Sequence, residues 1–215
     1  MSTATDLPAP AVTGALEVAD WRHRVFALYE VVRTTARTDA AAAHAGWIEG
    51  RDQLFREHPA SPLPAEERAG FAGLPVAPYD PSWRFEARIE PAEEATMEVD
   101  AGSDGSVRFD RLGLVAIPDL GTLDVWRLAG YGGGLFLPFR DGSSGAPGGS
   151  YGGGRYLLDT IKGAYLGLGG EPDAIVLDSN FAYHPSCAYD AAWTCPLAPP
   201  GNRVEGTIPV GERLR

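Results

Sequence analysis

Hydrophobic residues near the start of the chain recur at the spacing of an amphipathic helix. Between residues 18 and 32, apolar side chains lie three and four positions apart and share one face of a predicted helix. A second helical run begins after Thr38 or Asp39, and it has to end by His58 because Pro59 disfavours helical backbone at the residue before it. The two helices are expected to form an antiparallel hairpin.

From residue 81 onward the hydrophobic pattern changes to the period of a strand. Apolar and charged residues alternate over 85–89, and glycine-rich and proline-rich turns separate the runs that follow. Asp104-Gly105 predicts a hairpin turn, and Pro138 places its strand at a sheet edge or at a bulge. Further strands are predicted at 97–99, 107–109, 111–118, 120–129, 134–140, 155–159, 174–180 and 203–210.

These elements predict an α+β fold that is mainly antiparallel β, either a sandwich or a barrel-like sheet, with the helical hairpin packed on the sheet. Residues 1–14 are rich in Pro, Thr and Ala and are expected to form a disordered tail. No linker interrupts residues 15–215, so they are predicted to form one domain. Its helical part spans 15–80, and its β-rich part, 81–215, carries the candidate site.

The charge of the chain narrows the classes of partner. The 215 residues carry a net charge of −11, from 18 basic and 29 acidic residues. Such a chain offers no basic surface to nucleic acid and is repelled by anionic lipid, so neither partner is expected. The sequence contains no recognisable secretory signal or membrane-spanning run. These features predict a cytoplasmic protein, in which the two cysteines are thiols.

The first candidate binding residues surround a glycine-rich turn. Arg140 either pairs with an anionic ligand through its planar guanidinium or is fixed by a neighbouring strand. Gly152–Gly154 either present backbone N–H groups to an anion or form a plain turn. Arg155 follows the glycines and would add a fixed positive charge to such a site, with Tyr151 beside it.

The second group of candidates follows the predicted strand at 174–180. Asp178 and His184 are candidate bases, and Cys187 is a candidate thiol nucleophile with either of them as its partner. Asn180 is a candidate ligand-binding residue at the end of the same strand. A further alternative has His184, Cys187 and Cys195 as three ligands of a metal ion. The alternative without chemistry makes both cysteines buried small apolar residues.

Aromatic residues are concentrated in the same loop. Tyr183 and Tyr189 are expected to line a pocket for a small organic ligand, together with Phe181 and Trp193. Alternatively, the four rings form a satellite core that holds a long loop in place. The remaining histidines receive no functional assignment.

The order of several motifs resembles an uncharacterised bacterial family, the domain-of-unknown-function family 1684. The resemblance covers residues 47 to the end, and it implies a mainly β fold and a site in these motifs, without implying a reaction. Two positions depart from the family pattern, because Ser179 replaces a phenylalanine and His184 replaces an asparagine. The matching segments are WIEGRDQLFREHPASPL (47–63), FAGL (71–74), PFRD (138–141), YGGGRYL (151–157), LDSNFAYHPSCAY (177–189), CPLAPPGN (195–202) and VGERL (210–214).

The sequence therefore predicts a small protein that binds a polar, anionic small molecule, with Arg155 as the anion anchor. If the protein is an enzyme, cofactor-independent acid–base or thiol chemistry is expected. The alternative is a non-catalytic binding or interaction module in which the motif residues brace a long loop. No cofactor is predicted, and the oligomeric state is left open, with a homodimer as one alternative.

Overall fold

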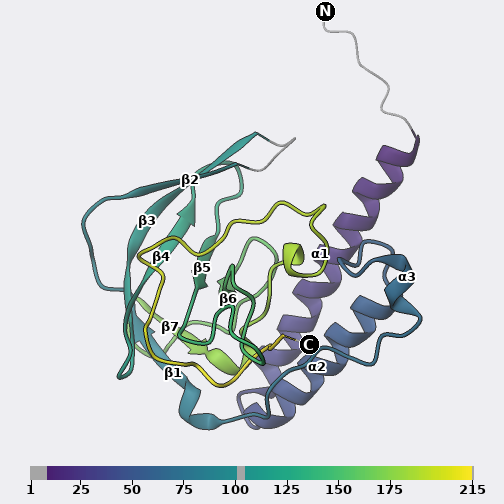
Figure 1. Ribbon diagram of the computed structural model, residues 1–215. Coiled ribbons are helices and arrows are strands. Elements are labelled where there is room, and N and C mark those ends of the chain that lie inside the picture. The colour runs from purple at the N-terminus through teal and green to yellow at the C-terminus, as the bar shows by residue number, and fades with distance from the viewer. Residues whose placement is uncertain (1–8, 101–104, 215) are drawn as a thin grey trace, which may run out of the picture.

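The computed structural model describes residues 9–100 and 105–214, and the side chains from residue 12 onward. Figure 1 shows a helical hairpin on one side of the molecule and the strands on the other, with the C-terminal end running back beside the helices. This arrangement confirms the α+β class with mainly antiparallel strands. Within the described residues the sheets form a sandwich-like pair and no closed barrel.

The helical hairpin consists of α1 (Ala9–Thr35) and α2 (Ala40–Glu57), and a short helix α3 (Ala65–Arg68) follows. Asp39 caps α2 by accepting from the backbone N–H of Ala42 at 2.9 Å, and α2 ends before His58 as predicted. The prediction of a tail over 1–14 is wrong for residues 9–14, which belong to α1. Pro10 lies in the first turn of α1, where a helix loses no hydrogen bond to proline. Residues 1–8 lie outside the described part.

The hairpin packs on loops that follow the strands. Trp47 of α2 is fully buried, and its indole N–H donates to the hydroxyl of Tyr29 on α1 at 3.1 Å. The same apolar cluster includes Ala164 and Leu166 from the loop after β6 and Phe181 after β7. The hairpin therefore covers the ends of these strands, and the space between hairpin and sheet is where a site can form.

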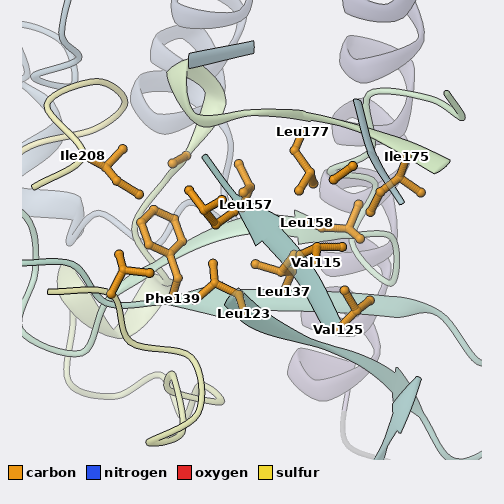
Figure 2. Packing of buried hydrophobic residues seen from close by; sticks show 14 of the residues in the cluster. Val115, Leu123, Val125, Leu137, Phe139, Leu157, Leu158, Ile175, Leu177 and Ile208 are labelled. Atoms are coloured by element: carbon orange, nitrogen blue, oxygen red, sulfur yellow. The ribbon is translucent and has the colours of Figure 1, made fainter. Parts of the chain in front are cut away.

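The strands form two antiparallel sheets. In the five-stranded sheet, neighbouring strands follow one another along the chain: β2 (Thr96–Asp100), β3 (Ser106–Ile117), β4 (Gly121–Leu128), β5 (Leu135–Phe139) and β6 (Arg155–Asp159). The second sheet pairs β1 (Arg84–Arg88) with β7 (Ala174–Asp178). The main core lies between the sheets, and Figure 2 shows Ile175 and Leu177 of β7 facing Val115, Val125 and Leu158 of the larger sheet.

Several strand predictions are confirmed and others need correction. Asp100 pairs with Ser106, as a hairpin requires, although Asp104 of the predicted turn lies outside the described residues. The register shifts between Leu137 and Pro138, which confirms the bulge. However, β5 lies inside its sheet and not at an edge.

Two predicted strands, 107–109 and 111–118, are one strand, β3, with an irregularity between Arg111 and Gly113. The segment 203–210 is not a strand. It makes a single parallel bridge between Arg203 and Arg140. Further along, the backbone of Ile208 bonds to the side chains of Arg155 and Asp141 and not to a neighbouring strand.

Candidate functional site

Two adjoining cavities lie where the helical hairpin meets the larger sheet. The inner cavity measures about 70 Å³ and the outer cavity about 350 Å³. The outer volume is within the range of small-molecule sites, about 300–1,000 Å³. The inner cavity has room for a few water-sized groups. The residues that line both cavities are Trp21, Pro62, Tyr156, Lys162 and Ser186.

A buried ion pair lies beside the inner cavity. Arg51 of α2 lines the cavity, and its Nη2 donates to Oε2 of Glu212 at 3.0 Å. The guanidinium also lies over the rings of Trp47, Phe55 and Tyr183, at 4.7, 5.4 and 5.2 Å from their centroids. Its Nη1 has no hydrogen-bond partner within residues 9–100 and 105–214. Arg51 is thus a buried cation whose charge is balanced by one carboxylate and three aromatic faces.

Glu212 is fully buried and is held by donors from several segments. Its Oε2 also accepts from the backbone N–H of His184 at 3.0 Å, and its Oε1 accepts from the hydroxyl of Tyr189. Burial by itself would raise the pKa of Glu212. Arg51, His184 and Tyr189 together outweigh burial and lower this pKa, so Glu212 is a charged carboxylate in the folded protein.

His184 is positioned as a neutral structural group. Its Nε2 accepts from the backbone N–H of Tyr151 at 3.0 Å, so the ring proton lies on Nδ1, which is 3.7 Å from Oε1 of Glu212. Burial lowers the pKa of His184, and Arg155 and Arg51 lower it further against the opposing effect of Glu212. Neither ring nitrogen offers a free lone pair to a substrate in this arrangement.

Two proton donors on the cavity walls have no acceptor in the part of the chain that the structure describes. The hydroxyl of Tyr29 accepts from Trp47, and its own proton has no acceptor among the described residues. Burial raises the pKa of Tyr29 to about 12, so the group is a proton donor. Lys162 is the only lysine in the sequence, and its ammonium makes no hydrogen bond or ion pair with any residue that the structure describes.

Asp159 supplies a carboxyl group to the outer cavity. It lies at the end of β6 and is almost fully buried. Its Oδ1 accepts from the backbone N–H of Lys162 at 3.2 Å, and its Oδ2 lies 3.5 Å from the hydroxyl of Tyr183. Burial raises the pKa of Asp159, which favours the neutral form compared with an exposed aspartate.

Arg155, the predicted anion anchor, lies in a different environment. It is 1% exposed, and its Nη2 donates to Oδ2 of Asp141 at 3.1 Å and to the carbonyl of Ile208 at 3.0 Å. Its Nη1 donates to the carbonyls of Val210 and Glu212. Arg155 therefore fixes the C-terminal segment to the PFRD turn, and it lines neither the inner nor the outer cavity.

The glycine turn is also part of the framework. The backbone N–H of Gly154 donates to the carbonyl of Tyr151 at 2.8 Å, which closes a plain turn, the alternative to an anion-binding loop. Arg140 bonds through its backbone to Asn202 and Val204, and its Nε is buried without a partner among the residues that the structure describes. Arg140 and Tyr151, like Arg155, line neither the inner nor the outer cavity.

Asp178 and Asn180 brace the end of β7. Asp178 is fully buried, and its carboxylate accepts from Asn180 and from Nη1 of Arg84, at 3.1 Å. The Asn180 amide bonds to the backbone of Asp80 at 2.8 Å in both directions, and His44 bonds to the Asn180 carbonyl at 3.0 Å. With these partners, both side chains serve the junction of β7, the 3-10 helix η3 (Ser179–Phe181) and α2, away from the cavities.

The cysteines lie near each other and apart from His184. The backbone N–H of Cys187 donates to Sγ of Cys195 at 3.4 Å, and both residues are free thiols. Among the described residues, no group of three His, Cys, Asp or Glu side chains is placed to hold a metal ion. The alternative of a site shared by His184, Cys187 and Cys195 is therefore wrong for this structure, because the imidazole faces Tyr151 and Glu212.

Of the predicted site residues, Tyr183, Tyr189 and His184 line the inner cavity. The charged residues beside it were not predicted. Arg51 and Glu212 belong to the motifs WIEGRDQLFREHPASPL and VGERL, so their place in the family pattern was an available signal. Lys162 could have been singled out because it is the only lysine in the sequence. No feature of the sequence distinguishes Tyr29 from the other residues on the apolar face of its helix.

The fold and the cavities define an α+β protein with a charged and aromatic cavity between a helical hairpin and a small β-sandwich. The chain belongs to the family described as "Protein of unknown function (DUF1684)", whose sequence model matches residues 69–213. The inner cavity therefore combines residues inside the matched range, such as Lys162 and Tyr183, with residues of the hairpin before it.

A solved structure supports this membership. The solution NMR structure of an uncharacterized protein from Haloarcula marismortui has 33% sequence identity to this chain and a TM-score of 0.54. The similarity covers 78% of this chain and 90% of that one. No curated protein matches the chain. Within the described residues, no helix combines the length and apolar character needed to cross a bilayer.

Proposed function

We propose that the protein binds a small organic anion, with its charged group near Lys162 and its apolar body in the outer cavity. The observation that carries this proposal is a set of donors on the cavity walls that have no acceptor among the described residues. These are the hydroxyl of Tyr29, Nη1 of Arg51 and the ammonium of Lys162. Tyr29 and Arg51 are buried, and a buried donor without an acceptor is costly. An anion would satisfy these donors and pair with the ammonium of Lys162.

The lining of the outer cavity indicates the rest of the ligand. Aromatic and aliphatic side chains from α1, the larger sheet and the loops beside them make most of its wall. Such a wall suits an aromatic or aliphatic body, and it does not suit a compact inorganic ion such as phosphate. A carboxylate on an apolar skeleton matches both parts of the site.

Binding without catalysis is the role that these groups support. Asp178 and His184, the predicted bases, have their acceptor atoms engaged by donors of the protein. Lys162 then acts as a positioning cation, because a hydrogen bond between charged groups contributes about 1.5–3 kcal/mol.

The proposal is tested by titrating the protein calorimetrically with benzoate, octanoate and phenyl phosphate, with benzamide as an uncharged control. We expect saturable binding of the carboxylates and none of benzamide. Lys162→Met should weaken carboxylate binding about tenfold or more, since 1.5–3 kcal/mol corresponds to at least that factor.

Arg203→Met is the matched control, because it removes one positive charge from an exposed side chain that lines neither the inner nor the outer cavity. The single lysine also allows the site to be located directly. Benzoate should protect Lys162 from acylation by an activated ester, as measured by peptide mass spectrometry. Absence of saturable binding across the panel, or equal affinities of Lys162→Met and Arg203→Met, would contradict the proposal.

A further inference from the structure

The two cysteines form a contact pair next to the outer cavity. Cys187 lies in the 3-10 helix η4 (Ser186–Ala188), and Cys195 begins the CPLAPPGN segment. The backbone N–H of Cys187 donates to Sγ of Cys195 at 3.4 Å, so the two residues are in direct contact. Both thiols are only half-buried, and neighbours of each along the chain, Ser186 and Pro196, line the outer cavity.

The surroundings make the two sulfurs chemically unequal. The neighbouring Cys187 side chain and the backbone N–H of Cys187, which donates at 3.4 Å, stabilise negative charge on Sγ of Cys195, and Lys162 adds positive charge. These groups outweigh burial and lower the pKa of Cys195. The same contact with Cys195, together with burial, raises the pKa of Cys187. The thiolate is the reactive form of cysteine, so the attacking sulfur is that of Cys195.

The second thiol is held within reach of the first. The hydroxyl of Tyr151 lies 4.0 Å from Sγ of Cys187, and the Tyr156 hydroxyl bonds to the carbonyl of Pro196. Anchors on both segments keep the sulfurs adjacent while they are reduced. These are the only cysteines in the sequence, so an oxidised Cys195 has one partner within the chain.

We propose that Cys195 and Cys187 are a peroxide-reactive redox pair, with Cys195 as the attacking and Cys187 as the resolving cysteine. The Cys195 thiolate attacks one oxygen of a hydroperoxide. The O–O bond breaks, and the other oxygen takes up a proton and leaves as an alcohol, or as water when the oxidant is hydrogen peroxide. Cys195 becomes a sulfenic acid. The sulfur of Cys187 then attacks that of Cys195, the S–S bond forms, and the S–O bond breaks with release of water. A dithiol reductant restores both thiols.

The test treats the full chain with hydrogen peroxide and follows its intact mass. The wild-type protein should lose two hydrogen atoms by forming an intramolecular disulfide, and dithiothreitol should reverse the change. Cys187→Ser should stop at the sulfenic acid of Cys195, which dimedone traps. Cys195→Ser should consume peroxide at about one tenth of the wild-type rate or below, because the remaining thiol lacks the donors around Cys195. The two variants serve as matched controls for each other.

A second measurement uses the unmodified protein and does not depend on the folding of either variant. Brief treatment with iodoacetamide, followed by peptide mapping, should label Cys195 before Cys187. The proposal is overturned if Cys187 is labelled first, if peroxide yields disulfides between chains and none within the chain, or if both serine variants consume peroxide at one rate. None of these outcomes depends on whether benzoate binds in the neighbouring cavity.

Discussion

Replacing Glu212 by glutamine tests whether the ion pair with Arg51 holds the hairpin to the β-rich part. The glutamine has the same shape, so its oxygen can still accept from Nη2 of Arg51 and from the backbone N–H of His184. The new NH₂ group, however, meets the hydroxyl of Tyr189 and faces Nδ1 of His184, which are both donors in the native protein. The guanidinium also loses its only carboxylate partner within the described residues.

The expected cost follows from these contacts. Removing one partner of a buried ion pair costs about 3–5 kcal/mol. The three aromatic rings around Arg51 and the retained hydrogen bonds place Glu212→Gln at the lower end, about 3 kcal/mol. For a chain of this length, that loss lowers the melting temperature by about 6–12 °C.

Urea unfolding at neutral pH, followed by circular dichroism, measures this loss. Glu205→Gln is the matched control, because the Glu205 side chain is 88% exposed and its bond to Arg203 is a surface pair. We expect the control to stay within about 0.5 kcal/mol of wild type. A loss in Glu212→Gln that is no larger than in the control would refute the reasoning.

The pH dependence gives an independent check on the same pair. The pKa of Glu212 is lowered in the folded protein, so its charge stabilises the fold above the unfolded-state pKa, about 4.3 for glutamate. This stabilisation is lost as the pH falls through the lower folded-state pKa. The difference between wild type and Glu212→Gln should therefore shrink in acid, and a difference that grew would contradict the assignment.

Three further substitutions follow from buried contacts. Asn202→Ala should cost about 3 kcal/mol or more in urea unfolding, because it removes two carbonyl partners and the acceptor of the Trp126 indole. Gly154→Ala should cost about 1–3 kcal/mol more than the control Gly148→Ala. Both glycines have a positive φ, but only at Gly154 would an added Cβ lie 2.4 Å from a carbonyl oxygen, that of Phe139. Burial lowers the pKa of His184, so wild type should lose stability as the pH falls below about 6.5, and His184→Asn should lack that loss.

Local patterns in the sequence predicted those elements whose causes are local. The end of α2 was predictable because Pro59 disfavours helical backbone at His58. The bulge in β5 was predictable because Pro138 lacks a backbone N–H for the sheet. The start of α1 was missed for a related reason, since the proline at position 10 was read as a tail residue although a first turn tolerates it.

The candidate site was only partly predictable, because its charged residues come from distant segments. Arg51 and Glu212 are separated by 161 positions, and no periodicity links them. Arg155 was singled out for its place beside the glycines. In the fold it is buried and paired with Asp141 at 3.1 Å, a contact between segments that no local pattern connects.

The sequence by itself determined the class of fold, the hairpin, most strands and the region of the motifs, because hydrophobic periodicity and turn residues act over a few positions. Only the tertiary structure decided which polar residues brace the chain and which face a cavity. Burial, and the identity of the partner that each charge meets, depend on segments brought together from both ends of the chain. For this reason Arg155 and Asp178 became internal braces, while Arg51 and Lys162 came to line the cavity.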